Sequence, residues 1–132
     1  MKVKDIMAKE VVTLEMDEEL SLADDIMQLG RIRHLPVVEK EKLVGIISQR
    51  DLFKGSLASV MGFGEKAKRD FLKTVAVKKI MVKKVITVSP DADIKDAGRI
   101  MLEKKIGCLP VVENDKLVGL ITETDILKQF II

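Results

Sequence analysis

The chain has no tryptophan, no tyrosine, one cysteine and one histidine among its 132 residues. A single cysteine excludes an internal disulfide and any metal site built from several cysteines, so Cys108 is interpreted as an inert core residue. With His34 as the only histidine, a cluster of histidine metal ligands is also excluded. Phenylalanine at four positions leaves few platforms for stacking bases, so nucleic-acid binding is not expected.

Charge and hydropathy exclude further classes of protein. The net charge is only +2, and acidic and basic residues are interspersed, unlike the arms that bind nucleic acids. No apolar run approaches the roughly 18 residues that a membrane span needs. The charged start also lacks the apolar stretch of a signal peptide. We therefore expect a cytoplasmic protein that does not bind membranes.

The main positive feature is an internal repeat. Residues 3–54 align without a gap with residues 77–128 at a constant offset of 74, and 24 of the 52 aligned positions are identical. This indicates a tandem duplication of a unit too small to bury a core alone. We expect one domain over residues 1–56, a linker with a short helix over 57–76, and a second domain over 77–132.

Each repeat is predicted to fold as strand, helix, strand, strand and helix, an α+β arrangement. The β-branched runs at 11–13 and 85–87 predict the first strands. Asp17 and Asp91 are expected N-caps of the following helices, and Gly30 is expected to end the first of them. The next apolar runs carry a proline near their start and are separated by polar turns, which predicts a hairpin in each repeat.

Both repeats end on the same motif, Gly-x-x-Ser/Thr-x-x-Asp, at 45–51 and at 119–125. Ser48 and Thr122 are expected to be N-caps, with the aspartate three positions on, close to a capping box. A helix start also presents unpaired N–H groups and the positive end of the helix dipole, which suit an anion. One copy would indicate only a capped helix. Two copies inside a longer repeat favour a binding role.

Together these features resemble a tandem pair of cystathionine-β-synthase (CBS) domains, a Bateman module. The resemblance rests on the two motifs above and on the matched runs Asp5-Ile6-Met7, Lys79-Ile80-Met81, Leu35-Pro36-Val37-Val38 and Leu109-Pro110-Val111-Val112. It covers nearly the whole chain outside the linker. It implies two β-α-β-β-α units packed sheet to sheet about a pseudo-twofold axis, with two clefts between them.

The resemblance also implies roles for individual residues. Those implied to bind the ribose hydroxyls are Asp51 and Asp125. Those implied to lie beside phosphate are Ser48, Arg50, Thr122 and Thr124, and the residues that can add positive charge are Arg33 and His34. The apolar walls implied for the base are Ile6, Met7 and Ile32 in one cleft, and Ile80, Met81 and Ile106 in the other. Each cleft would combine the opening segment of one repeat with the motif of the other.

Every assignment has a structural alternative. The two aspartates can serve only as helix caps, Arg33 and His34 can be surface residues, and the methionines can be core. Gly107 and Cys108 stand where the first repeat has Arg33 and His34, so the two clefts are expected to differ in affinity for charged ligands.

The function expected is a regulatory module that senses AMP, ADP, ATP or S-adenosylmethionine. It would act through a partner protein or through its oligomeric state, as a homodimer, with no cofactor required beyond the regulatory ligand. The alternative is a structural dimerisation module with no nucleotide ligand. An enzyme is disfavoured because the sequence offers no nucleophile–base pair. The apolar end of the C-terminal helix is expected either to pack into the core or to form an oligomer contact.

Overall fold

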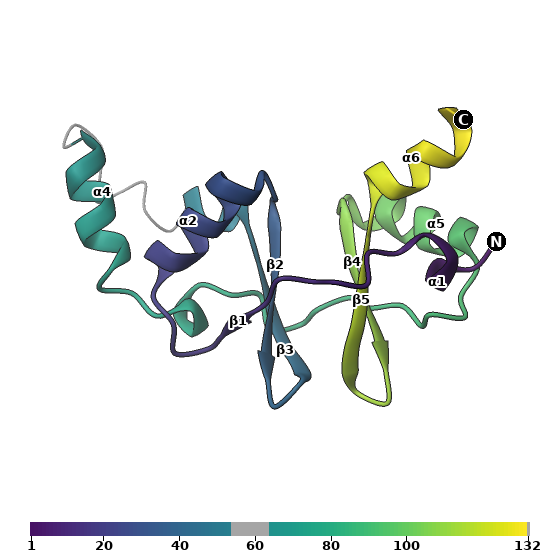
Figure 1. Ribbon diagram of the computed structural model, residues 1–132, viewed down its shortest axis with the longest axis horizontal. Coiled ribbons are helices and arrows are strands. Elements are labelled where there is room, and N and C mark those ends of the chain that lie inside the picture. Colours follow the sequence, from purple (N-terminus) through teal and green to yellow (C-terminus); the bar gives the residue numbers. More distant parts are fainter. Residues whose placement is uncertain (54–63, 132) are drawn as a thin grey trace. The chain divides into compact units, whose positions relative to one another are not determined.

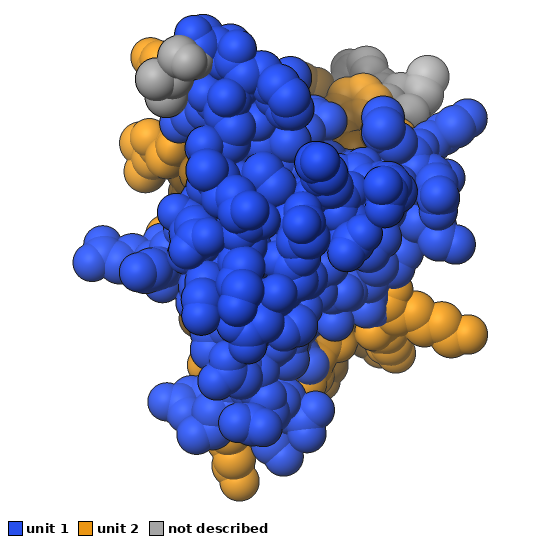
Figure 2. Space-filling view, turned by 90° about the vertical axis from the view of Figure 1, so that its right-hand side faces the viewer, with its two compact units in different colours: residues 1–11, 41–43, 85–132 blue, residues 12–40, 44–84 orange. Residues whose placement is uncertain are grey.

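A computed structural model of the chain describes residues 1–53 and 64–131, which form two compact units (Figure 1). Unit 1 comprises residues 1–11, 41–43 and 85–132, and unit 2 comprises residues 12–40 and 44–84 (Figure 2). The units therefore do not coincide with the sequence repeats. Each unit takes its opening segment from one repeat and its main body from the other.

Unit 2 follows the predicted order of elements. These are β1 (Leu14–Glu15), α2 (Leu20–Gly30), β2 (His34–Glu39), β3 (Lys42–Ser48), the helical residues 49–53, α4 (Gly64–Leu72) and the 3-10 helix η1 (Val77–Lys79). β1 pairs with β2 in parallel, with Leu14 opposite Val37. β3 lies on the other side of β2, after a two-residue turn.

Unit 1 repeats this plan. Its elements are α1 (Val3–Ile6), α5 (Ile94–Lys104), β4 (Cys108–Glu113), β5 (Lys116–Thr122) and α6 (Glu123–Ile131). β4 and β5 are antiparallel, as predicted for the hairpin, and Val88 forms a parallel bridge to Val111. The first residues of β3 also belong to this unit, where Lys42 pairs with Lys116. The α+β class expected from the sequence is confirmed.

Each opening segment is anchored by one fully buried valine. Val3 lies in the core of unit 1 with Leu109 and Ile121, and its side chain is 0% exposed. Val77, also 0% exposed, lies in the core of unit 2. Burying a valine of this size contributes about 1.5–3 kcal/mol. The exchange of opening segments between the repeats is thus part of each core.

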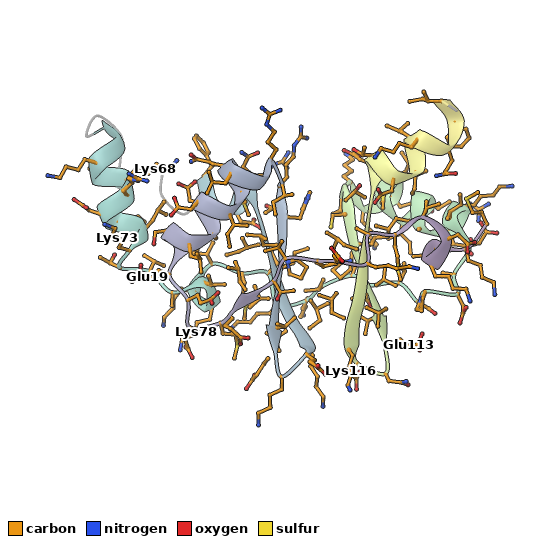
Figure 3. All side chains as sticks on the ribbon, in the orientation of Figure 1. Glu19, Lys68, Lys73, Lys78, Glu113 and Lys116 are labelled. Carbon is orange, nitrogen blue, oxygen red and sulfur yellow. The ribbon has the colours of Figure 1, made fainter. Side chains whose placement is uncertain are left out.

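The helix starts differ from the prediction. α2 follows Glu19 and α5 follows Asp93, so neither Asp17 nor Asp91 is an N-cap. Instead, Asp17 Oδ1 accepts from Lys78 Nζ at 2.9 Å (Lys78 is labelled in Figure 3), and Asp91 Oδ1 lies 3.1 Å from Lys4 Nζ. Both pairs tie an opening segment to the loop before a helix. They are exposed, so they orient the segment more than they stabilise it.

The first strands also differ from the prediction. Residues 11–13 and 85–87 are irregular, and the strand contacts fall one residue later, at Leu14 and Val88. The side chains of Leu14 and Val88 are 1% and 8% exposed, whereas Val12 is 51% exposed. Burial against the neighbouring strand decides the position of each short strand, and β-propensity alone does not.

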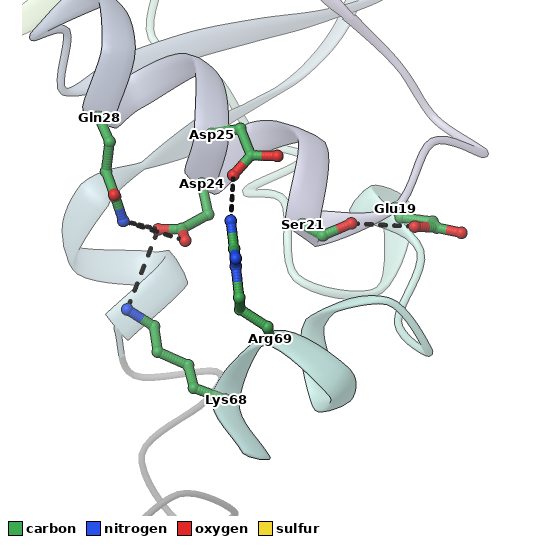
Figure 4. A network of polar contacts seen from close by, with 7 residues as sticks. All are labelled: Glu19, Ser21, Asp24, Asp25, Gln28, Lys68 and Arg69. Atoms are coloured by element: carbon green, nitrogen blue, oxygen red, sulfur yellow. Dashed lines mark hydrogen bonds and ion pairs between the residues drawn. The ribbon is translucent and has the colours of Figure 1, made fainter. Parts of the chain in front are cut away.

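The described part of the expected linker contains α4, and residues 54–63 lie outside the described residues. α4 packs on α2, where Lys68 Nζ lies 4.0 Å from Asp24 Oδ1 and Arg69 NH2 lies 3.9 Å from Asp25 Oδ1 (Figure 4). Leu72 at the end of α4 is fully buried in the core of unit 2. The linker helix is therefore a component of this unit.

α2 ends at Gly30, as the sequence predicts, but Gly30 itself is not left-handed. It is the last helical residue, and the left-handed position is Arg31, with φ 53°. Lys105 holds the matching position after α5, with φ 55°. Residues with a Cβ adopt this conformation at a cost that glycine avoids, so both sites are strained.

We expect Arg31→Gly and Lys105→Gly each to raise the free energy of unfolding, by about 0.5–1 kcal/mol, because glycine removes the left-handed penalty. Gly30→Ala should also stabilise, because Gly30 is helical and a Cβ there would meet only Ile32 at 3.7 Å or beyond. Urea unfolding of the three variants measures the change. A loss of stability in Arg31→Gly would show that the conformation of this residue is not the cause of strain.

Candidate ligand-binding site

The predicted caps are present in both units. In unit 2, Ser48 Oγ accepts from Asp51 N at 3.1 Å, while Asp51 Oδ2 accepts from Ser48 N at 3.0 Å and from Ser48 Oγ at 2.8 Å. In unit 1, Thr122 Oγ1 accepts from Asp125 N at 3.3 Å, while Asp125 Oδ2 accepts from Thr122 N at 2.9 Å and from Thr122 Oγ1 at 3.1 Å. We call the surroundings of the Ser48–Asp51 cap site 2 and those of the Thr122–Asp125 cap site 1.

Each cap uses only one of the two oxygens of its aspartate carboxylate. Within the described residues, neither Asp51 Oδ1 nor Asp125 Oδ1 has a hydrogen-bond partner, and both side chains are half-buried. An ionised carboxylate oxygen carries two acceptor positions. The capping role and a ligand-binding role are therefore compatible in the same side chain.

The backbone at each helix start also retains one donor. Gln49 N donates to the carbonyl of Arg33 at 2.8 Å, and Glu123 N donates to the carbonyl of Gly107 at 3.0 Å. The hydroxyl of the cap residue accepts from the N–H two positions further on, that of Asp51 or Asp125. Within the described residues this leaves the N–H of Arg50 and of Thr124, at the positive end of each helix dipole, as the open donor.

The glycine of each motif makes room for a methionine of the other repeat. A Cβ built on Gly119 would lie 2.5 Å from Met7 Sδ and 2.9 Å from the carbonyl oxygen of Ala8. A Cβ built on Gly45 would lie 2.6 Å from Met81 Sδ. A side chain at either position would force a neighbouring atom to shift. Sequence reasoning did not assign these glycines a role, although their identity in both repeats was the available signal.

Backbone bonds hold each opening segment beside its glycine strand. Ala8 and Leu120 exchange two hydrogen bonds of 2.9 and 3.0 Å, and Val82 and Ile46 do the same at 2.9 and 3.0 Å. Each site therefore combines an opening segment with the motif of the other repeat, which is the combination that the sequence resemblance implied.

The apolar residues are grouped differently from the expectation. Ile6 and Met7 pack in the cluster that contains Ile106, whereas Ile32 packs with the second opening segment. The members of the unit 2 cluster are Ile32, Ile80 and Met81. The expectation placed Ile32 with the first opening segment and Ile106 with the second, whereas in the two cores each strand entrance packs with the body of its own unit. The role of these residues as walls for a base stays a prediction.

The polar candidates differ between the two sites. Arg33 and Arg50 are exposed, and His34, the first residue of β2, is half-buried. At the matching positions of unit 1, Thr124 is exposed and Cys108 is buried. Sequence reasoning missed Glu123, whose carboxyl carbon and Oε1 would lie 3.2 Å from a Cβ built on Gly107. The absence of a side chain at Gly107 leaves space that Glu123 fills.

Two further findings concern the part of the chain that the structure describes. No group of three or more histidine, cysteine, aspartate or glutamate side chains is placed to hold a metal ion there. None of its helices combines the length and the apolar character that crossing a bilayer demands.

Comparison with known proteins gives a consistent family match. The family model of the CBS domain matches residues 3–58 and again residues 77–131. Inosine-5′-monophosphate dehydrogenase of Methanocaldococcus jannaschii is 35% identical over 130 residues, which are 97% of this chain and 23% of that protein. The chain thus spans less than a quarter of this curated relative.

Two solved structures share the fold over almost the whole chain. Protein MJ1225 of Methanocaldococcus jannaschii is 33% identical with a TM-score of 0.85, over 98% of this chain and 47% of that one. The CBS domain pair of protein MJ0100, solved with 5′-methylthioadenosine and S-adenosyl-L-methionine, is 29% identical with a TM-score of 0.78. That alignment covers 98% of this chain and 95% of the solved domain pair.

The glycine contacts generate a matched pair of variants. We expect Gly119→Ala to lower the free energy of unfolding by about 1–3 kcal/mol, because the new methyl group meets a backbone carbonyl that cannot move alone. Gly45→Ala should cost less, because there the nearest carbonyl is 3.1 Å away and the closest atoms belong to the flexible Met81 side chain. Urea unfolding of both variants tests this order. Equal costs would mean that the methionines, and not the Ala8 carbonyl, set the constraint.

Cys108 should be unreactive in the native chain. Burial raises the pKa of its thiol from 9.0 to about 12, and the Asp125 carboxylate adds to that rise. At pH 8 the thiolate fraction falls by about a thousandfold, so labelling by a disulfide reagent should be slow in buffer and fast in urea. The unfolded thiol ionises first, so this group contributes stability below about pH 9 that is lost as the pH rises toward 12. Fast labelling in buffer would refute the burial.

Proposed function

The chain belongs to the CBS domain family, and from that premise we propose that it is a regulatory module that binds adenine-containing ligands at sites 1 and 2. One observation carries the proposal. In each unit the strand that ends at a cap with an uncommitted carboxylate oxygen and an open helix N–H is hydrogen-bonded to an opening segment that carries apolar side chains, which supports the proposal. A nucleoside with a 5′ substituent offers complementary groups for all three.

The chemistry of these groups indicates which part of the ligand each would bind. Asp51 Oδ1 and Asp125 Oδ1 accept from the ribose hydroxyls, since a carboxylate oxygen can accept more than one hydrogen bond. The hydroxyls of Ser48 and Thr122 and the N–H groups of Arg50 and Thr124 face the 5′ substituent. The isoleucine and methionine walls receive the flat base. The MJ0100 complex supports adenosyl ligands, because that protein holds two of them.

The output of the module is a change in its association with other chains. A ligand shifts an equilibrium only if it binds two states with different affinity. The end of α6 does not pack into a core, because its apolar side chains are exposed. The exposed fractions are 57% for Leu127, 80% for Phe130 and 81% for Ile131. Such an apolar surface suits a homodimer contact or an effector protein. A structural dimerisation module without ligand would use the same surface, so ligand binding separates the two hypotheses.

The proposal predicts thermal stabilisation by AMP, ADP, ATP or S-adenosylmethionine. A ligand at about 100 times its dissociation constant adds roughly 2.7 kcal/mol to stability, a clear shift in melting temperature. Asp51→Asn and Asp125→Asn should each abolish binding at one site in calorimetric titrations, while retaining an oxygen that can cap the helix. Asp70→Ala, on the exposed surface of α4, is the control.

A second readout uses the absence of tryptophan and tyrosine. The purified, nuclease-treated chain absorbs little near 260 nm, so a strong band there would reveal a co-purified nucleotide. If none of the four ligands shifts the melting temperature and no such band is present, the ligand-free dimerisation module replaces this proposal.

A further inference from the structure

The residues that form the two sites differ in charge, always in one direction. Arg33, Gln49 and Arg50 at site 2 are matched by Gly107, Glu123 and Thr124 at site 1. The opening segments show the same bias. Lys79 and Lys84 in unit 2 are matched by Asp5 and Glu10 in unit 1. All five differences make site 2 more positive than site 1.

At site 2 the positive residues are attached directly to the helix start. The carbonyl of Arg33 accepts from Gln49 N at 2.8 Å, so the Arg33 side chain leaves the backbone beside the first turn. Arg50 carries the open N–H of that turn. Both side chains are exposed and can reach a ligand, and arginine binds phosphate oxygens in a bidentate manner. Site 2 therefore carries two exposed guanidinium groups on the residues around its helix start and one carboxylate, that of Asp51.

At site 1 the three matched positions hold one acid, Glu123, and no base. The carbonyl of Gly107 accepts from Glu123 N at 3.0 Å, and the Glu123 carboxylate lies 3.2 Å from the point where a Gly107 Cβ would stand. Asp125 adds a second carboxylate at the third position of the helix. A polyphosphate here would meet two like charges, which oppose its binding.

Other acidic residues of unit 2 do not reverse this difference. Asp24 and Asp25 of α2 lie within ion-pair distance of Lys68 and Arg69 of α4 (Figure 4). Asp17 is bound by Lys78 in the same way that Asp91 is bound by Lys4 in unit 1, so these pairs balance between the units.

We infer that the sites are specialised by charge. Site 2 takes an adenine nucleotide with a 5′ phosphate chain, and site 1 takes an adenosyl ligand whose 5′ group carries no phosphate. This inference rests on the proposed function and assigns a ligand class to each site. The specificity-determining residues are Arg33 and Arg50 at site 2 and Glu123 with Gly107 at site 1.

The test is calorimetric titration of the full chain with ATP and with 5′-methylthioadenosine, which share adenosine and differ in the 5′ group. ATP should bind with one equivalent, and 5′-methylthioadenosine should still bind with one equivalent when ATP is saturating. Asp51→Asn should remove the ATP isotherm alone, and Asp125→Asn the 5′-methylthioadenosine isotherm alone.

Charge variants separate specificity from folding. Arg33→Gly and Arg50→Thr, which install the site 1 residues, should each weaken ATP about tenfold or more and leave 5′-methylthioadenosine unchanged. Arg31→Gly removes an arginine from the same unit outside the site and is the matched control, with ATP affinity expected within about twofold at 0.15 M salt. Glu123→Gln should allow a second, weaker ATP equivalent at site 1.

Each outcome has a separate meaning. Two results would overturn the charge assignment while leaving adenosyl binding intact. The first is loss of ATP binding in Asp125→Asn but not in Asp51→Asn, and the second is an equal weakening of the binding of both ligands by Arg33→Gly. Binding of each ligand at two equivalents would do the same. If neither ligand binds, the proposed function itself fails.

Discussion

The close approach of a methionine to a strand glycine is the contact on which each unit depends. Met7 lies where a Gly119 side chain would stand, and Met81 lies where a Gly45 side chain would stand. Because each methionine comes from one repeat and each glycine from the other, neither repeat completes its core alone. The buried Val3 and Val77 extend the same dependence into the hydrophobic core.

This exchange also explains why site and fold are inseparable here. The bridge between Ala8 and Leu120 places an apolar wall beside the strand that ends in Thr122 and its capped helix. A change at the opening segment therefore alters both the core and the apolar wall of the candidate site. Under the proposed function, ligand binding and core packing would share these residues, so that binding could shift the packing.

The site was partly predictable from sequence because its caps are local. Ser48 with Asp51 and Thr122 with Asp125 are three positions apart, so hydrogen bonds within one helical turn decide their geometry. The helix starts near Asp17 and Asp91 were misplaced because those acids bind lysines of the opposite repeat, a long-range contact that local spacing does not contain.

The amino-acid sequence by itself determined the duplication, the order of elements in each repeat and the two capped motifs. These features depend on repeated residue patterns and on hydrogen bonds between residues close together in the sequence. Only the tertiary structure decided that Ile32 packs in the same core as Met81 and not with Met7, and that the Glu123 carboxylate lies against Gly107. The physical reason is that these contacts join residues far apart in sequence, and close packing selects among arrangements that the same pattern permits.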